Sequence, residues 1–301
     1  MIIITGGAGF IGSALVWQFN QYNYDDIIVV DSLGLKDKWL NLKKRRFLTF
    51  IHKKDFFQWL ETEKPVVDMV FHMGACSCTT EEDADYLIQN NFLYSQKLFR
   101  YCALNNIPLV YASSAATYGG GELGYDDELS LIYKLKPINK YGFSKQLFDY
   151  WVLKQNHKPL LWVGFKFFNV YGPQEYHKSS QASVVLHAFN QIKQQGKVNL
   201  FKSYKKEYAH GEQKRDFVYI KDVVELMYYI FNNKANIKSG IYNVGTGQAR
   251  SFLDLAESVF KAMDIDKINI KWIPMPRNIK NQYQYFTQAN IHKLKQFVWP
   301  G

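Results

Sequence analysis

Tyr141 and Lys145, in the sequence YGFSK, have the residue types and the spacing to transfer a proton. Side chains four residues apart lie on the same face of a helix. A tyrosine hydroxyl has an ordinary pKa of about 10, too high for a base at neutral pH. A lysine ammonium beside the phenol favours its ionised form, so Tyr141 could take a proton from a hydroxyl group. Ser114, at the end of the apolar stretch in YASSAATYG, could orient the same hydroxyl.

A second stretch, NVYGPQEYHKSSQ at 169–181, also contains groups that could carry protons. Its first five residues predict a strand that runs into a turn, and His177 and Lys178 follow in a polar loop. Taken alone, the pattern indicates a solvated loop in which Lys178 is an ordinary surface charge. Lys178 would belong to an active site only if the reaction there needed a second proton-transferring group.

The sequence TGGAGFIG at 5–12 predicts a turn that binds phosphate. Gly7-x-Gly9-x-x-Gly12 matches the dinucleotide-binding fingerprint, and Gly6, Gly9 and Gly12 are also spaced by three. The glycines follow an apolar strand and open a helix, which is the context that the fingerprint requires. Glycine lets the backbone approach a pyrophosphate closely, and the helix N-terminus supplies free N–H groups. The alternative is a tight strand-to-helix turn without a ligand.

The choice between NAD and NADP depends on the residues after the second strand. Asp31 lies 19 residues after Gly12, where an acidic residue holds the ribose 2′-hydroxyl of NAD. Lys38 and Lys53, together with Lys36 and Lys54, lie in the neighbouring segments and could hold the 2′-phosphate of NADP. We predict NADP and leave NAD open.

An alternation of strands and helices would position all of these residues. Apolar stretches predict strands at 2–4, 27–31, 66–72, 108–112 and 160–168, and helical patterns at 10–22, 82–104, 141–155 and 181–195. This alternation is typical of an α/β fold, a doubly wound parallel sheet (Rossmann) with a smaller interleaved substrate-binding lobe. We expect an NADP-binding Rossmann domain at 1–168 plus about 214–245, to whose sheet Ile241–Val244 could return. The substrate-binding lobe is expected at about 169–213 plus 246–301.

Composition limits the class of protein. Hydrophobic residues make up 47% and charged residues 21% of the 301 residues, which is enough for a packed core. No run of about 18 apolar residues would span a membrane, and the start MIIITGG is unlike a signal peptide, so we expect a cytoplasmic protein. Three cysteines cannot make a disulfide framework, and their spacing predicts no metal site. The net charge of +10 suits phosphorylated ligands, and no nucleic-acid-binding motif accompanies it.

Four motifs together, TGGAGFIG, YASSAATYG, YGFSK and NVYGP, resemble the extended short-chain dehydrogenase/reductases, the NAD-dependent epimerase/dehydratase family. More narrowly, HMGACSCTTE at 72–81, FNVYGPQEYHKSSQASV at 168–184, KRDFVYIKDV at 214–223 and YQYFTQAN at 283–290 resemble the ADP-L-glycero-D-manno-heptose 6-epimerases. The resemblance implies a bacterial isomerase with tightly bound NADP. Its substrate would be ADP-D-glycero-β-D-manno-heptose, inverted at C6″ to supply the heptose of the lipopolysaccharide inner core. The resemblance also implies a homo-oligomer, for which a pentamer is one option.

The resemblance assigns roles residue by residue. The catalytic residues would be Ser114, Tyr141, Lys145 and Lys178, the last as a second acid/base that serves the other face of a ketone intermediate. Desolvation beside other cations would bring the pKa of Lys178 toward neutrality. The implied cofactor contacts are Gly6, Gly9, Phe10, Ile11, Gly12, Asp31, Ser32, Lys38, Lys53, Met73, Gly74, Ala75, Cys76, Ser77, Asn90, Tyr141, Lys145, Val170 and His177. The implied substrate contacts are Asn169, Lys178, Ser180, His187, Phe201, Lys202, Ser203, Tyr204, Arg215 and Tyr283. The guanidinium of Arg215 also suits a diphosphate on chemical grounds.

Two other functions stay open. A UDP-sugar 4-epimerase shares the Ser/Tyr/Lys set but does not require a lysine at 178. A 4,6-dehydratase is disfavoured, because it would carry an Asp-Glu pair where this chain has Ala115-Ala116. A cofactor-binding regulator without catalysis, recruiting RNA through basic surface residues, would have no need of the complete catalytic set.

Overall fold

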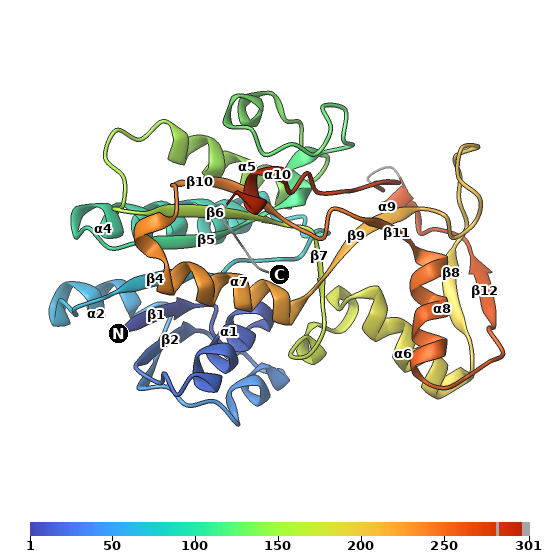
Figure 1. Cartoon of the computed structure of the whole chain (residues 1–301), viewed down its shortest axis with the longest axis horizontal. Helices are drawn as coiled ribbons and strands as arrows, with labels where there is room; N and C mark the ends of the chain where they lie inside the picture. The colour runs from blue at the N-terminus through green and yellow to red at the C-terminus, as the bar shows by residue number, and fades with distance from the viewer. Residues whose placement is uncertain (281–282, 297–301) are drawn as a thin grey trace.

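A seven-stranded parallel sheet is the centre of the fold (Figure 1). The computed structural model describes residues 1–280 and 283–296, so part of the predicted lobe at 246–301 lies outside the described residues. The strands are β1 (Ile2–Thr5), β2 (Ile27–Asp31), β3 (Thr49–His52), β4 (Met69–His72), β5 (Leu109–Ser114), β6 (Trp162–Phe167), β7 (Asn169–Tyr171), β8 (Val198–Phe201), β9 (Lys214–Tyr219), β10 (Gly240–Val244), β11 (Ala249–Ser251) and β12 (Ile270–Ile273). The main sheet has the order β10-β6-β5-β4-β1-β2-β3.

Helices cover both faces of this sheet and also form part of the smaller lobe. They are α1 (Phe10–Gln21), α2 (Phe56–Glu63), α3 (Ala84–Leu87), α4 (Tyr94–Leu104), α5 (Lys140–Leu153), α6 (Val184–Gln195), α7 (Ile220–Asn232), α8 (Phe252–Ala262), α9 (Arg277–Lys280) and α10 (His292–Lys295). Shorter turns are the 3₁₀ helices η1 (Asp37–Leu42), η3 (Ala115–Tyr118), η4 (Leu129–Lys134), η5 (Tyr176–Gln181) and η6 (Lys234–Asn236), and the π-helical η2 (Ile88–Leu93). No helix in these described segments is long and apolar enough to cross a membrane.

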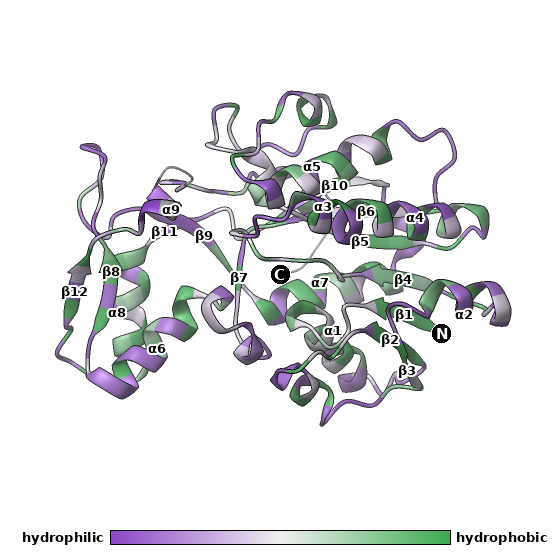
Figure 2. Cartoon of the chain, turned by 180° about the vertical axis from the view of Figure 1, so that it is seen from behind, coloured by the Kyte–Doolittle hydropathy of each residue, from purple (hydrophilic) through white to green (hydrophobic). Residues whose placement is uncertain are grey.

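The alternation of side chains along each strand divides the core into two layers. Ile2 and Ile4 of β1 pack in the cluster that contains Phe19 of α1 and Met227 of α7. Ile3, between them, packs in the cluster built by α2, α4 and α5 on the opposite face. Successive residues of a strand point to opposite faces, so a parallel sheet covered on both sides has apolar residues at every position. Figure 2 shows this apolar centre between the two helical layers.

A smaller lobe extends from one end of the sheet (Figure 1, right). In it β8 pairs with β12 in parallel, and α6 and α8 pack on these strands around a separate apolar cluster. β7, β9 and β11 form a three-stranded sheet. The segment 214–245 divides between these parts, because β9 joins the three-stranded sheet, α7 packs on α1, and β10 pairs with β6 in the main sheet.

The doubly wound α/β fold predicted from the sequence is confirmed, and so is the return of Ile241–Val244 to the main sheet. The predicted strand at 66–72 begins only at Met69, because Val66 is exposed and Asp68 accepts a hydrogen bond from the N-terminal amine instead. The prediction of a single helix at 82–104 is also wrong. The helical segment begins at Ala84, where Asp83 caps it, and widens to a π-helical turn at Ile88–Leu93. The prediction omitted β3, a partly exposed strand with a weak apolar pattern.

Candidate active site

The glycine loop packs so tightly that side chains at three of its positions, Gly6, Gly7 and Gly12, would collide with backbone. A Cβ on Gly12 would lie 2.2 Å from the carbonyl oxygen of Gly6, and one on Gly6 would lie 2.6 Å from Gly74. Gly6 also has a φ of +66°, which favours glycine. Gly9 precedes α1 without a side-chain cap, so N–H groups of the first turn are available to an anion. The loop therefore fits the pyrophosphate-binding turn predicted from its sequence.

A cavity of about 170 Å³ lies beside this loop, at the carboxyl ends of β1, β2 and β4. This is the point where the strand order reverses, and dinucleotides bind at such points in this fold. Nine predicted cofactor residues line it: Gly6, Asp31, Ser32, Lys38, Lys53, Gly74, Ala75, Cys76 and Asn90. Thr5, Val30, Tyr86 and Tyr94 line it too and were not predicted. The two tyrosines belong to α3 and α4.

Asp31 and Lys38 form an ion pair at the rim of this cavity. The Lys38 Nζ lies 2.5 Å from a carboxylate oxygen of Asp31. The Asp31 carboxylate also accepts the N–H groups of Ala8 and Ser32, at 3.0 and 2.7 Å. Lys53 donates to the side chain of Asn90 at 2.9 Å. The acidic group expected for NAD and two cations expected for NADP therefore share one cavity.

Ser114, Tyr141 and Lys145 come together at the carboxyl end of β5. The hydroxyl of Ser114 hydrogen-bonds the phenol of Tyr141, and the Lys145 Nζ donates to the carbonyl of Ala112 at 2.8 Å. Gly142 allows α5 to approach this closely, since a Cβ there would lie 2.6 Å from the carbonyl oxygen of Ala116. The one-face geometry predicted from YGFSK is therefore present.

Burial changes the ionisation of both residues. It lowers the pKa of Lys145 from 10.5 to about 8, opposed by the carboxylate of Asp149. It raises the pKa of Tyr141, opposed by the hydrogen bond to Ser114. The residues by themselves therefore keep Tyr141 protonated at neutral pH, so a nearby lysine alone does not produce the phenolate.

Asp149 of α5 belongs to a buried polar network one turn along the helix from Lys145. Its carboxylate lies 2.8 Å from the Lys166 Nζ and accepts hydrogen bonds from Ser113 and Tyr111, at 2.6 and 3.1 Å. The Lys166 Nζ also donates to the hydroxyl of Thr117. Asp149 and Lys166 are both fully buried, and a buried pair of charges is tolerated where every polar group is satisfied.

Lys178 lies beside the start of α1 and not in open solvent. Its Nζ is 5.5 Å from the centroid of the Phe10 ring. Burial lowers the pKa of Lys178, and the carboxylate of Glu175 opposes that effect. Next to it, the Nδ1 of His177 lies 3.0 Å from the side-chain nitrogen of Asn41, which also donates to the carbonyl of Ala8 in the glycine loop. The interpretation of Lys178 as an ordinary surface charge is therefore wrong.

Several predicted substrate residues gather around Arg215. Its guanidinium carbon lies 5.1 Å from the ring centroid of Tyr283, and burial lowers the pKa of Arg215. Within the part of the chain that the structure describes, no carboxylate lies within ion-pair distance of Arg215. Tyr285, whose ring contacts that of Tyr283, accepts the N–H of Tyr204 at 2.9 Å and so joins the segment 201–204 to this cluster.

Seven other predicted residues are exposed or half-buried. Asn169, Ser77 and Ser180 are exposed, and His187 is half-buried in the first turn of α6. Ile11, Met73 and Val170 are half-buried, and none of the three lines the cofactor cavity. Met73 is held through its backbone N–H, which donates to Thr5.

Asn91 was missed by the sequence reasoning. From the π-helical turn its fully buried side chain binds both the N–H and the carbonyl of Cys76, and it donates to Ser144 of α5. It thereby connects the segment at Cys76, which lines the cavity, to α5, which carries Tyr141 and Lys145. The widened turn directs this side chain inward, and such turns are frequent at functional sites. The sequence signal that could have identified Asn91 is a polar residue within the helical pattern at 82–104.

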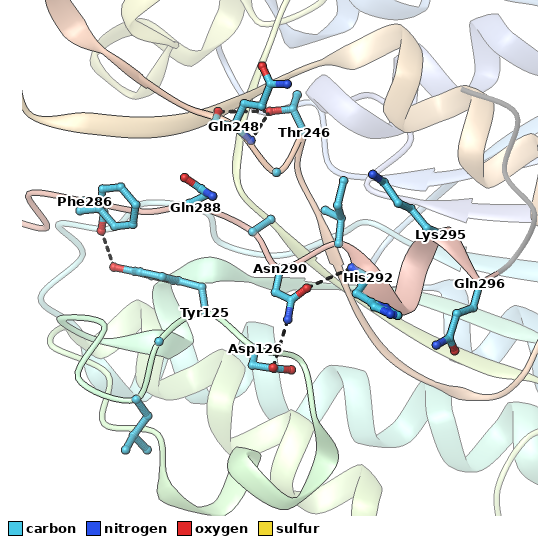
Figure 3. Close-up of a pocket in the computed structure, with 15 residues that line it drawn as sticks. Tyr125, Asp126, Thr246, Gln248, Phe286, Gln288, Asn290, His292, Lys295 and Gln296 are labelled. Atoms are coloured by element: carbon cyan, nitrogen blue, oxygen red, sulfur yellow. Dashed lines mark hydrogen bonds between the residues drawn. The ribbon is translucent and has the colours of Figure 1, made fainter.

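A larger cleft of about 1040 Å³ lies elsewhere, and Figure 3 shows its lining. The loop 123–126, the loop 246–248 and the segment 286–296 form its walls. Asn290 donates to Asp126 across it, and Tyr125 donates to the carbonyl of Phe286. None of the predicted catalytic, cofactor or substrate residues lines this cleft.

The model of the NAD dependent epimerase/dehydratase family matches residues 2–245. The chain belongs to this family. It is 53% identical to an ADP-L-glycero-D-manno-heptose-6-epimerase of Fusobacterium nucleatum, over 98% of this chain and 91% of that protein. It is 47% identical to the enzyme of the same name from Nitratidesulfovibrio vulgaris, over 100% of this chain and 92% of that one.

Solved structures of epimerases have the same fold as this chain. The ADP-L-glycero-D-manno-heptose-6-epimerase of Helicobacter pylori superposes with a TM-score of 0.76 at 31% identity, over 97% of this chain and 87% of that one. A UDP-glucose 4-epimerase of Thermus thermophilus in complex with NAD has a TM-score of 0.79 at 25% identity, over 99% and 93%. The resemblance stated from the motifs, and the predicted enzyme class, an epimerase, are confirmed.

Proposed function

We propose that this chain converts ADP-D-glycero-β-D-manno-heptose into ADP-L-glycero-β-D-manno-heptose by inverting C6″, for lipopolysaccharide inner-core synthesis. The observation that carries the proposal is the pair of proton-transferring groups. Tyr141, in the first turn of α5, hydrogen-bonds Ser114 at the end of β5, and Lys178 lies half-buried beside Phe10 at the start of α1. The relatives with 47–53% identity carry the name of this reaction.

The residues present fit a bound nicotinamide dinucleotide. The glycine loop would hold the pyrophosphate, and Asp31, Lys38 and Lys53 would hold the adenosine ribose. We propose NADP, because Lys38 and Lys53 line this cavity beside the single carboxylate of Asp31, and a 2′-phosphate would offset the remaining positive charge. When bound, the nicotinamide supplies the chemistry of accepting a hydride from C6″ and returning it.

Each catalytic side chain then has a role that follows from its surroundings. Ser114 would orient the C6″ hydroxyl, and Tyr141 would take or return its proton on one face. The protein alone keeps Tyr141 protonated, so the positive nicotinamide would contribute to lowering its pKa. Lys145 would hold the nicotinamide ribose and add its charge. Lys178 would handle the proton on the other face, since burial makes its neutral form more accessible.

We propose an NADP-binding domain at 1–168 plus about 214–245 and a substrate-binding lobe at about 169–213 plus 246–301, with Arg215 just inside the first of these at their junction. Arg215 would bind the diphosphate, because its guanidinium is buried among tyrosines and has no carboxylate partner within residues 1–280 and 283–296. A cytoplasmic location in a bacterium and a homo-oligomeric state, such as a pentamer, complete the proposal.

Two measurements test this function. The first is mass spectrometry of the nucleotide released on denaturation, for which we expect NADP. The second is turnover of each ADP-heptose epimer compared with UDP-galactose. Tyr141→Phe and Lys178→Met variants should each lose most epimerisation, roughly a hundredfold or more, while folding and cofactor binding persist. Turnover of UDP-galactose alone, or full activity of Lys178→Met, would contradict the proposal.

A further inference from the structure

The loop that carries Lys178 has an unfavourable backbone. Two of its non-glycine residues, Gln174 and Ser179, have positive φ angles of 85° and 50°, and Ser179 interrupts the 3₁₀ helix η5 with a ψ of −122°. L-residues rarely adopt these conformations, so they persist only where surrounding contacts impose them. Some contact must therefore hold residues 172–183 in place.

Glu175 makes that contact. Its side chain is 2% exposed, although it carries a carboxylate. One oxygen accepts the N–H of Gly172 at 2.9 Å and the hydroxyl of Ser183 at 2.8 Å, and the other accepts the N–H of Ser183. Gly172 and Ser183 are the two ends of the loop, so one side chain connects both. A buried carboxylate that accepts several N–H and O–H groups is a strong structural tie.

The same loop is anchored on its other side to the glycine loop. The side-chain nitrogen of Asn41 donates to the carbonyl of Gln174 at 3.1 Å and to that of Ala8 at 3.0 Å. The backbone N–H of Lys178 donates to the carbonyl of Glu175 at 2.9 Å. The loop is therefore attached at its ends by Glu175 and near its start by Asn41, and Lys178 lies between Gln174 and the attachment at Ser183.

Charge adds to this mechanical role. No cation lies within ion-pair distance of the Glu175 carboxylate in the described segments. Its negative charge raises the pKa of Lys178 against the lowering effect of burial. Without the negative charge of Glu175, less electrostatic attraction would offset the loss of hydration of the Lys178 ammonium.

We propose that Glu175 is the positioning residue of Lys178, because its carboxylate ties the two ends of the loop 172–183 and so fixes the ammonium beside Phe10. Glu175 does not touch the reacting atoms in this proposal and acts only through Lys178. The inference rests on the proposed acid/base function of Lys178.

The first test measures the loop without catalysis. Glu175→Gln is almost the same size, but its amide group offers one oxygen where three donors converge. In the holoenzyme we expect the amides of Gly172 and Ser183 to exchange with deuterium about tenfold faster or more in Glu175→Gln. Amides of β1 and α7 should be unchanged. The matched control is Glu225→Gln, an exposed glutamate on α7, which should leave the loop unaltered.

The second test uses the two faces of the reaction. If Lys178 serves one epimer and Tyr141 the other, Lys178→Met should slow reduction of the nicotinamide by one ADP-heptose epimer and spare reduction by the other. Near-ultraviolet absorbance in a single turnover measures each rate. We expect Glu175→Gln to slow the same epimer by about tenfold or more. A general loosening of the fold would slow both epimers equally.

The outcomes separate the two proposals. Unchanged exchange at Gly172 and Ser183, or equal slowing of both epimers, would overturn the role of Glu175. If the wild-type protein turned over neither epimer, the proposed function would fail while the exchange result still decided whether Glu175 holds the loop. Should Glu175→Gln not fold, Glu175→Asp provides the same measurement, because a shorter carboxylate cannot reach both ends. Exchange as slow as wild type in Glu175→Asp would then refute the proposal.

Discussion

Lys145→Met should make the folded protein more stable at neutral pH while it removes activity. Burial lowers the pKa of Lys145 from 10.5 to about 8, and each pKa unit corresponds to about 1.4 kcal/mol. The folded state therefore holds the ammonium at a cost of about 3 kcal/mol relative to the unfolded chain. The hydrogen bond to Ala112 returns about 2 kcal/mol as a charged donor. Methionine, of similar length, should then raise stability by about 1 kcal/mol.

The sign of the pH dependence follows from the same shift. Below pH 8 both folded and unfolded chains carry the Lys145 proton, so this group adds no slope. Between pH 8 and 10.5 the unfolded chain still holds the proton and the folded chain has lost it, so wild-type stability rises with pH. The variant lacks this group. Wild-type stability should rise by about 2.5 kcal/mol between pH 7 and pH 10. The advantage of the variant, about 1 kcal/mol at pH 7, should therefore become a deficit of about 1.5 kcal/mol near pH 10.

Urea unfolding of both proteins at pH 7 and pH 10 measures this difference. Both should first be freed of bound nucleotide, because a ligand of the native state adds its own stabilisation. Lys145→Gln, which keeps a polar group but no charge, is the matched control and should show the same pH trend. A stability difference between wild type and Lys145→Met that is independent of pH would refute the argument from burial.

Three further results are expected. Gly12→Ala should weaken binding of the dinucleotide by about tenfold or more in a fluorescence titration, since its Cβ would meet the backbone 2.2 Å away; unchanged affinity would show that the loop can open freely. Asp149→Asn should lower the free energy of unfolding by about 3–5 kcal/mol by leaving the buried Lys166 ammonium unpaired. The double change Asp149→Leu with Lys166→Met should recover most of that loss in urea unfolding, and no recovery would contradict the charge argument. Lys38→Met should weaken NADP binding about tenfold more than NAD binding in calorimetric titrations, whereas equal losses would place the 2′-phosphate elsewhere.

The fold was largely predictable because its signals are local. Ile2–Ile4 and Ile27–Val30 are continuous apolar runs, and only a strand buried on both faces needs such a run. The strands of the smaller lobe were not predicted. β8 and β12 have four residues each, and 68 residues of sequence separate the end of β8 from the start of β12. No local sequence pattern therefore indicates that these two strands pair.

The predicted chemistry of this protein follows from short sequence patterns. The glycine spacing at 5–12 and the four-residue interval from Tyr141 to Lys145 depend only on local backbone geometry, and both are present in the structure. The environment of each ionisable side chain depends instead on the folded chain around it. Burial, which no local pattern encodes, lowers the pKa of Lys145 and Lys178. It also reversed the expectation for Lys178, because desolvation depends on neighbours such as Phe10 and Glu175, which only the folded chain brings to its side chain.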